Sequence, residues 1–292
     1  AAVAADVNLL RRPILIDGFA VEVGASVGYD RWNEGAEPLE DAAHRADLAM
    51  YEAKSRGPNH SLIFEPSMQD RVTERASLET KLRGAIQSKA IKIHYQPLID
   101  LSSGRITGFE ALVHWPHAER GMVSPAEFIP VAEETGLIVP MSEWALRQAA
   151  RQARIWADAF GFSDSIAVNM PNRMFERTDL IEQISSAVRE EGIPHSMIQL
   201  EITETGLMKD LQRVIPSLHR LTEIGVQIAV DDFGTGYSSL AYLTSLPIAE
   251  VKIDRSFVRD LGVLPQSLAV VTAIIALAKS LDLKVVAEGV EN

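Results

Sequence analysis

Two adjacent aspartates, Asp231 and Asp232, stand at the end of an apolar run, Val226 to Val230, that is typical of a buried strand. A glycine-containing turn, Gly234 to Gly236, follows them. Adjacent carboxylates at the mouth of a core strand repel each other and resist desolvation, so a cation between them stabilises them. Helix capping in a solvated turn is the alternative, because aspartate is a good N-cap residue. Capping explains one aspartate better than two, so the pair favours a metal site.

Other polar side chains stand at the ends of further predicted strands. They are Glu110 with His114, Asn169, Glu201 with Glu204, Lys252 with Asp254, and Glu288 with Glu291. Taken singly, each has an ordinary structural interpretation, such as a rim salt bridge or a turn residue. In an α/β barrel, however, the C-terminal strand ends meet on one rim, where such folds carry their chemistry. Carboxylates and an amide suit Mg²⁺ or Mn²⁺, and two such ions about 3.5 to 4 Å apart activate water for attack on phosphorus.

The elements that must position these residues alternate between strand and helix beyond residue 90. We predict strands over residues 92–98, 106–114, 166–170, 197–203, 226–231, 250–254 and 284–288. Predicted helices cover residues 125–135, 142–160, 179–191, 209–224 and 256–281. The connection between the first two strands, residues 100–105, is too short for a parallel crossover, so this pair should be antiparallel. The pattern predicts a TIM-like (β/α) barrel with an antiparallel first strand, and its last strand is missing from the sequence.

The first 66 residues have a different pattern. A strand over residues 21–27 and a helix over residues 37–56 predict a small, partial α+β unit. A charged amphipathic helix over residues 67–88 predicts a linker, which leaves residues 89–292 for the barrel. The chain begins without methionine inside an alanine-rich run and stops directly after an apolar strand. We therefore expect a fragment of a longer protein, truncated at both ends.

Composition narrows the function classes. The chain has 28 basic and 40 acidic residues and a formal net charge of −12, which argues against binding to long nucleic acid. It has no cysteine, so thiolate metal sites and disulfides are excluded, and a cytoplasmic location is expected. Its longest apolar stretch, residues 268–278, is too short to span a bilayer, so we expect no membrane contact from this segment. Domains outside the sequence could still anchor the parent protein.

An ordered series of motifs resembles the EAL-domain family of cyclic di-GMP phosphodiesterases. The motifs are Tyr95-Gln96-Pro97, Glu110-Ala111-Leu112, Phe128-Ile129-Pro130, Val168-Asn169, Glu201-Ile202-Thr203-Glu204, Asp231 to Leu240, Val251-Lys252-Ile253-Asp254 and Ala287 to Glu291. Upstream, the run Arg45 to Lys54 followed by Gly57-Pro58-Asn59 resembles the C-terminal part of a GGDEF (diguanylate cyclase) domain. The GGDEF signature loop would precede Ala1, so the resemblance implies no cyclase activity for this chain.

The EAL resemblance implies metal-dependent hydrolysis of cyclic di-GMP to linear pGpG by a homodimer. It implies a two-metal site of Mg²⁺ or Mn²⁺, in which the ligands are Glu110, Asn169, Glu201 and Asp231 for one ion and Asp231 with Asp232 for the other. It implies three catalytic residues: Lys252 positions or polarises the attacking water, Glu288 acts on that water or its shell, and Glu204 braces the loop over residues 232–239. The implied substrate contacts are Gln96, Leu112, His114, Pro130, Asp254 and Glu291.

One residue departs from the family pattern. The family usually has arginine four residues after the motif glutamate, where it contacts a substrate phosphate, and this chain has His114. A neutral ring in place of a permanently charged fork predicts weaker substrate binding but not lost metal binding. Alternatively, His114 packs against Trp115. The departure keeps two other functions open: a module that binds cyclic di-GMP without hydrolysing it, and an interaction scaffold without a ligand.

Overall fold

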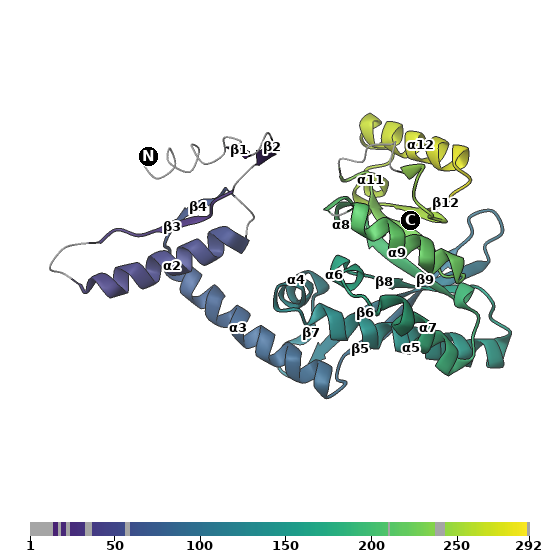
Figure 1. Cartoon of the computed structure of the whole chain (residues 1–292), viewed down its shortest axis with the longest axis horizontal. Helices are drawn as coiled ribbons and strands as arrows, with labels where there is room; N and C mark the ends of the chain where they lie inside the picture. Colours follow the sequence, from purple (N-terminus) through teal and green to yellow (C-terminus); the bar gives the residue numbers. More distant parts are fainter. Residues whose placement is uncertain are drawn as a thin grey trace. The chain divides into compact units, whose positions relative to one another are not determined.

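The structure is a computed structural model that describes residues 14–16, 19–21, 24–32, 37–55, 59–209, 211–236 and 243–290. The chain divides into two compact units, residues 1–82 and 83–292. The long helix α3 (Pro66–Gln87) contains the boundary between them. In Figure 1 the first unit runs from purple to blue, and the second unit runs from blue to yellow.

The described part of the first unit contains two small sheets, helix α2 and most of helix α3. Strands β1 (Ile14–Ile16) and β2 (Phe19–Val21) form an antiparallel hairpin. Strands β3 (Val27–Tyr29) and β4 (Ser61–Ile63) pair in parallel, and helix α2 (Leu39–Ser55) contacts both of them. The predicted strand over residues 21–27 is wrong, because residues 24–26 are irregular and the strand begins at Val27. A Cβ on Gly28 would lie 2.0 Å from Met50 N, so only glycine lets α2 approach this strand.

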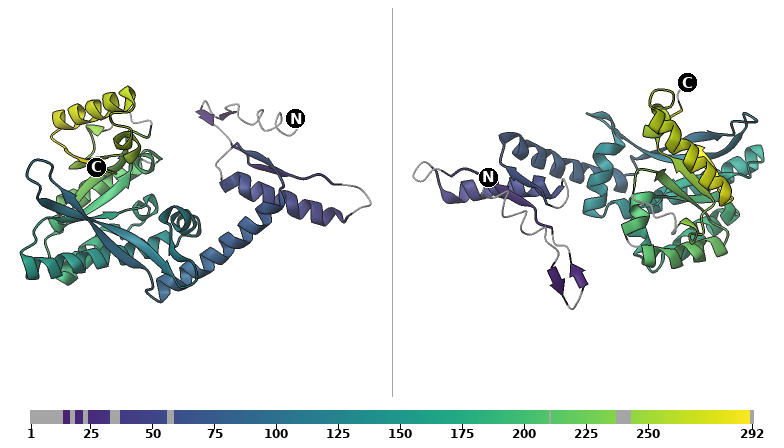
Figure 2. Two further views of the ribbon diagram at one scale, coloured as in Figure 1. Left: turned by 180° about the vertical axis from the view of Figure 1, so that it is seen from behind. Right: turned by 90° about the horizontal axis from the view of Figure 1, so that it is seen from above.

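The second unit is built on an eight-stranded sheet that curls into an incomplete barrel (Figure 2). Its strands are β5 (Lys92–Ile99), β6 (Ile106–His117), β7 (Gly121–Val123), β8 (Ser165–Asn169), β9 (Ile198–Thr203), β10 (Gln227–Phe233), β11 (Glu250–Ile253) and β12 (Lys284–Ala287). The order across the sheet is β12-β11-β10-β9-β8-β6-β5, and β7 pairs with β6. The predicted antiparallel first pair is confirmed, since β5 runs antiparallel to β6. The remaining neighbouring pairs, β6–β8, β8–β9, β9–β10, β10–β11 and β11–β12, are parallel.

Helices follow most of these strands and surround the sheet. They are α4 (Pro125–Thr135), α5 (Ile138–Phe160), α6 (Asn172–Phe175), α7 (Leu180–Glu191), α8 (Glu204–Lys209), α9 (Leu211–Glu223), α11 (Arg255–Arg259) and α12 (Pro265–Ser280), with a 3₁₀ turn over His195–Met197. Helix α5 contacts β6 and β8, α9 contacts β10, and α12 contacts β11 and β12 (Figure 1). The alanine-rich face of α5 is buried, which allows this helix close contact with the sheet.

The helix predicted over residues 256–281 is wrong as one element. The structure divides it into α11 and α12, with an irregular segment between Asp260 and Leu264. Gly262 has φ +81°, a left-handed conformation that interrupts a helix. Pro265 then starts α12, because the residue before a proline is driven out of the helical region while proline suits the first helical turn.

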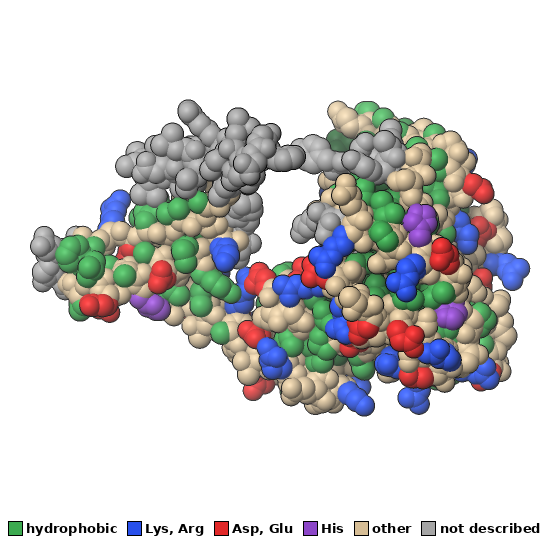
Figure 3. Space-filling view, in the orientation of Figure 1, with side chains coloured by type: hydrophobic (Ala, Val, Ile, Leu, Met, Phe, Trp, Pro, Cys, Tyr) green, Lys and Arg blue, Asp and Glu red, His purple; other side chains and the backbone are tan. Residues whose placement is uncertain are grey.

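The described part of the chain contains no helix that is both long enough and apolar enough to cross a membrane. In the second unit, the face shown in Figure 3 carries basic and acidic side chains interspersed with each other. A mixed surface of this kind lacks the continuous basic stripe that long nucleic acid requires.

Candidate active site

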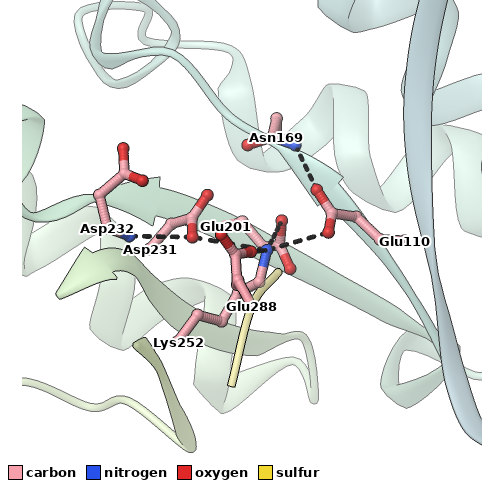
Figure 4. Close-up of polar contacts among 7 residues, drawn as sticks. All are labelled: Glu110, Asn169, Glu201, Asp231, Asp232, Lys252 and Glu288. Atoms are coloured by element: carbon pink, nitrogen blue, oxygen red, sulfur yellow. Dashed lines mark hydrogen bonds and ion pairs between the residues drawn. The ribbon is translucent and has the colours of Figure 1, made fainter. Parts of the chain in front are cut away.

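Six strands bring polar side chains to one region of the second unit (Figure 4). The seven residues are Glu110 on β6, Asn169 at the end of β8, Glu201 on β9, Asp231 and Asp232 on β10, Lys252 on β11 and Glu288 immediately after β12. In the parallel register, Asn169 on β8 pairs with Glu201 on β9. Glu201 pairs in turn with Ala229 on β10, and Ala229 pairs with Glu250 on β11. These seven predicted residues, from a sequence span of about 180 residues, therefore form one group, which we call the carboxylate cluster.

Lys252 lies at the centre of this cluster. Its Nζ atom is 2.7 Å from Glu288 Oε1, 3.0 Å from Glu110 Oε2, 3.0 Å from Glu201 Oε2 and 3.5 Å from Asp231 Oδ1. The lysine residue is 0% exposed and Glu201 is 1% exposed, so the central ion pair is removed from solvent. A buried ammonium is tolerated only because several carboxylates compensate its charge.

The electrostatics of the cluster show an excess of negative charge. Burial, with the nearby charges of Glu110 and Asp231, raises the pKa of Glu201 well above its ordinary value, even though Lys252 acts in the opposite direction. Burial is also the main cause that raises the pKa of Glu288. For Lys252, burial favours the neutral amine, but the surrounding carboxylates outweigh it and raise its pKa. Lys252 therefore remains a cation and cannot serve as a general base at neutral pH.

Asp232 faces a different environment from Asp231. In Figure 4 its carboxylate points away from Lys252. Its backbone has φ 54°, and its N–H donates to Asp231 Oδ1 at 2.9 Å. Burial, followed by the charges of Asp231 and Asp254, raises the pKa of Asp232 to about 6. Holding a non-glycine residue in the left-handed region stores strain, which is often found at functional sites.

Asp254, a predicted substrate contact, caps helix α11. Its Oδ1 accepts from the backbone N–H of Ser256 at 2.9 Å and from the Ser256 hydroxyl. Burial opposes the shift, but these hydrogen bonds and one from Asp232 hold the pKa of Asp254 below its usual range. The side chain is therefore an anion beside Asp232, which it helps to keep protonated.

Glu204 supports the turn that follows β10. This carboxylate is 0% exposed, and its Oε2 accepts from the backbone N–H of Gly234 at 2.7 Å. A Cβ on Gly236 would lie 2.6 Å from Glu204 Oε1, so the turn passes directly over the carboxylate. The predicted bracing contact is therefore present as far as Gly236, and residues 237–239 of the predicted loop lie outside the described residues.

The glycine contact leads to a prediction. A Cβ at residue 236 can be accommodated only if Glu204 gives up its hydrogen bond from Gly234, so Gly236→Ala should lower the free energy of unfolding by about 1 to 2 kcal/mol. Urea denaturation measures this change. The matched control is Gly84→Ala in α3, where a Cβ meets nothing within 4 Å and alanine should stabilise the helix by up to about 1 kcal/mol. Equal stability of Gly236→Ala and the wild type would disprove the bracing contact.

A second prediction concerns Asp232 and pH. Its folded pKa of about 6 exceeds the usual unfolded value, so the stability that it contributes is present at acidic pH and is lost as the pH rises through about 6. Without divalent metal, Asp232→Asn should raise the free energy of unfolding by about 1 kcal/mol at pH 8 and change it little at pH 4. Asparagine also accepts the left-handed backbone. Denaturation at both pH values tests this, with the exposed Asp164→Asn as control, and a pH-independent difference would contradict it.

The residues fit a bound divalent cation. One carboxylate oxygen each from Asp231, Asp232 and Glu288 lie within 4.8 Å of one another. Both carboxylate oxygens of Glu201 are buried without a hydrogen bond, and Lys252 compensates only one of them as an ion pair at 3.0 Å. A set of oxygen donors with uncompensated negative charge is the donor set that Mg²⁺ or Mn²⁺ prefers. Glu288 thus belongs to this group of three candidate metal ligands, which we call the closest ligand group. The sequence analysis had predicted for Glu288 only a role in acting on the metal-bound water or its shell.

The ligands predicted for the first metal are Glu110, Asn169, Glu201 and Asp231, and of these only Asp231 belongs to the closest ligand group. Asn169 Nδ2 donates to Glu110 Oε1 at 3.0 Å, and the Lys252 ammonium lies between Glu110 and Glu201. These two glutamates are not part of the closest ligand group. A metal held by Glu110 and Glu201 would therefore require Lys252 to move.

The predicted substrate contacts are distributed along β5, β6 and α4. Gln96 lies exposed on β5, directly opposite Glu110 in the register. Leu112 is half-buried on β6. Pro130 is exposed within α4, and no contact between it and the cluster is recorded among the described residues. Glu291 lies outside the described residues.

His114 does not pack as the structural alternative predicted. Its ring stacks on His94 at a centroid distance of 4.0 Å and an angle of 24°, while the aromatic neighbours recorded for Trp115 are His117 and Phe128. Sequence reasoning did not single out His94. The signal was present, because residues 92, 94 and 96 alternate onto one face of a strand that was predicted to pair with the strand of His114.

A cavity of about 440 Å³ lies at the ends of β8 and β9. It is lined by Glu133, Glu134, Ile138, Pro171, Asn172, Arg173, Phe175, Glu176, Thr203, Thr205, Gly206, Arg213 and Val214. None of the seven residues of the carboxylate cluster lines it, so the cavity and the cluster are separate features of the second unit.

A curled parallel sheet with its polar cluster near the C-terminal strand ends is the arrangement of TIM-like barrel enzymes. The model of the EAL domain family matches residues 79–292, and the chain belongs to this family. EAL-domain structures are TIM-like barrels, in agreement with the curled sheet.

Relatives and solved structures extend this comparison. The chain is 39% identical over 286 residues to the bifunctional diguanylate cyclase/cyclic di-GMP phosphodiesterase MucR of Pseudomonas aeruginosa, covering 98% of the chain and 42% of MucR. It is 38% identical over 283 residues to the cyclic di-GMP phosphodiesterase PdeR of Escherichia coli, covering 97% of the chain and 42% of PdeR. The solved complex of the PaMucR phosphodiesterase with c-di-GMP superposes with a TM-score of 0.72 at 42% identity, covering 74% of this chain and 87% of that one. The chain thus spans less than half the length of these two curated relatives.

Proposed function

We propose that this chain is a metal-dependent phosphodiesterase that hydrolyses cyclic di-GMP to linear pGpG. The observation that carries the proposal is the carboxylate cluster around Lys252, in a chain whose EAL-domain relatives are named cyclic di-GMP phosphodiesterases. A dianionic substrate can approach so acidic a site only when cations compensate the charge.

The residues divide between metal binding, charge compensation and support. Glu110, Asn169, Glu201 and Asp231 would hold one Mg²⁺ or Mn²⁺, and Asp231 with Asp232 would hold the second. When bound, the metal pair supplies Lewis-acid stabilisation of the phosphoryl oxygens and lowers the pKa of water. Lys252 remains protonated, and once it has moved from between Glu110 and Glu201 it would be a hydrogen-bond donor for the attacking water. Glu288, whose pKa is raised chiefly by burial, would act on the attacking water or its shell.

Substrate contacts and partners belong to the same proposal. The substrate-binding residues are Gln96, Leu112, His114, Pro130, Asp254 and Glu291. Glu204 transmits the state of the cluster to the turn after β10, and we propose a homodimer that forms through this domain. A cytoplasmic location remains a prediction.

For the first unit, we propose a C-terminal fragment of a GGDEF domain over residues 1–66, a linker helix over residues 67–88 and the EAL domain over residues 89–292. The motif run Arg45 to Lys54 supports it, and the name of the relative MucR includes a diguanylate cyclase. Sequencing the gene upstream of Ala1 tests this division, because a GGDEF signature loop should be encoded there.

A binding module without turnover is the second candidate. The position of the Lys252 ammonium between Glu110 and Glu201 favours it, since a cation of the protein then stands where a metal would be held. Calcium typically supports ligation of the dinucleotide without hydrolysis, whereas Mg²⁺ or Mn²⁺ supports turnover. Binding in Ca²⁺ with pGpG formation in Mg²⁺ or Mn²⁺ is expected for the enzyme, and binding without product in any of the three ions for the module.

A further inference from the structure

The inner face of the β5–β6 pair carries basic side chains at one end. Alternate residues of a strand share a face, and directly paired residues on neighbouring strands point to the same side. The register pairs Lys92 with His114, His94 with Leu112, and Gln96 with Glu110. Because β5 runs antiparallel, its first residue lies beside the last part of β6. Lys92, His94 and His114 therefore form a basic group on the same face as Glu110.

The two histidines of this group hold each other in a defined orientation. Their rings stack at 4.0 Å, and His114 Nδ1 lies 3.0 Å from the backbone oxygen of Leu112. A carbonyl oxygen can only accept, so Nδ1 carries the hydrogen and donates it. The remaining nitrogen, Nε2, is then the atom that His114 can present to a ligand. The stacked ring of His94 fixes the orientation of the His114 ring.

Lys92 supplies the permanent charge of the group. Its side chain is exposed, and no carboxylate within ion-pair distance is recorded for it in the described parts of the chain. The four-carbon stem gives the ammonium a wide reach. Cα atoms four residues apart on a strand are roughly 13 Å apart, so Lys92, opposite His114, lies that far along β5 from Gln96, which stands opposite Glu110.

The basic group thus lies at one end of the strand pair, four residues along β6 from Glu110 of the carboxylate cluster. A cyclic dinucleotide carries two phosphodiesters, and the carboxylate cluster with its metal accounts for the one that is cleaved. Building on the proposed function, we infer that Lys92 binds the second, uncleaved phosphate, with the His94–His114 stack as its neighbouring platform. Lys92 is then a specificity-determining residue for cyclic dinucleotides.

The test compares two variants on two ligands. Lys92→Gln removes the charge, and Lys279→Gln removes an exposed charge on α12 as the matched control. The ligands are cyclic di-GMP and an analogue in which one of its two phosphodiester linkages is neutral. Calorimetry in Ca²⁺ should give about tenfold weaker binding of cyclic di-GMP by Lys92→Gln, and a weaker dependence on salt, with no change for the control. The conservative Lys92→Arg should retain most of the affinity.

The neutral-linkage analogue separates charge recognition from a structural effect. Lys92→Gln should bind this analogue as well as the wild type does, because the interaction that it removes is already lost. In Mg²⁺ the same variant should have a higher KM than the wild type and nearly the same kcat. This result would indicate that Lys92 binds the substrate and the transition state equally well. Unchanged affinity for cyclic di-GMP, or an equal loss on both ligands, would overturn the role of Lys92 and leave the hydrolase intact. No binding and no pGpG from the wild type would overturn the proposed function itself, and the role of Lys92 with it.

Discussion

Replacing Lys252 by methionine should lower the free energy of unfolding by about 3 kcal/mol at pH 7 in the absence of divalent metal. The reason is that the ammonium is fully buried and compensates four carboxylates within 3.5 Å. Methionine fills a similar volume without the charge, so Glu110, Glu201 and Asp231 would be left close together without a cation. Breaking a buried pair costs much more than an exposed one, because the remaining charge is left uncompensated.

The dependence of this loss on pH follows from the pKa shifts. The folded pKa of Lys252 is raised, so its contribution to stability is fully present below the unfolded pKa of about 10.4 and persists through neutral pH. The difference between Lys252→Met and the wild type should shrink at acidic pH, because Glu201 and Glu288 have raised pKa values and become neutral there. Added Mg²⁺ should restore part of the stability by replacing the lost cation.

Urea denaturation at pH 5 and pH 7, with EDTA or with Mg²⁺, measures these effects. The control is Lys279→Met, which removes an exposed charge and should change the free energy of unfolding by less than about 0.5 kcal/mol. A Lys252→Met variant as stable as the control at pH 7 in EDTA would show that the ammonium does not compensate the cluster.

Glu201→Gln should reduce kcat by about 10³-fold and at the same time make the metal-free chain more stable. The loss of activity is expected because Lewis-acid stabilisation contributes several kcal/mol and needs the carboxylate charge. The gain in stability is expected because burial raises the pKa of Glu201. The protonated form of Glu201 stabilises the fold at low pH, and this contribution is lost as the pH rises through the folded pKa. Glutamine imitates the neutral form at every pH.

Thermal unfolding distinguishes this trade-off from simple damage. In EDTA at pH 7 the variant should melt roughly 3 °C above the wild type, equivalent to about 1 kcal/mol. Saturating Mg²⁺ should reverse the order, since the wild type gains about 2.7 kcal/mol at a hundredfold excess over Kd and the variant gains little. The exposed Glu182→Gln on α7 is the control. A variant that is stabilised by Mg²⁺ as strongly as the wild type would remove Glu201 from the metal site.

Much of this fold could be predicted from the sequence because apolar runs of strand length alternate with helical periods. The predicted helix over residues 125–135 coincides with α4, and the antiparallel start was predicted from the short connection before Ile106. The break before Pro265 was missed, although Leu-Gly-Val-Leu-Pro is a stop signal, because apolar residues continue on both sides of it. Residues 24–26 were predicted as strand from alternation alone, which cannot exclude a loop of small residues.

The candidate site was predictable in its members but not in its contacts. Strand ends in an α/β barrel converge, so polar residues at those ends could be grouped without a structure. The sequence could not predict that Lys252 pairs with Glu288 more closely than with any other carboxylate, since this distance depends on side-chain packing. Nor could it predict that His114 stacks on His94, because the exact register across β5 and β6 decides which rings meet.

Product formation from cyclic di-GMP tests the central claim most directly. The chain is incubated with the dinucleotide in Mg²⁺, Mn²⁺, Ca²⁺ or EDTA, and the nucleotides are separated by chromatography while binding is measured in parallel. The proposed phosphodiesterase should form pGpG with Mg²⁺ or Mn²⁺, bind without turnover in Ca²⁺, and lose turnover in EDTA and in Glu201→Gln. Binding of cyclic di-GMP without pGpG in Mg²⁺ and in Mn²⁺ would contradict the enzyme and leave a binding module.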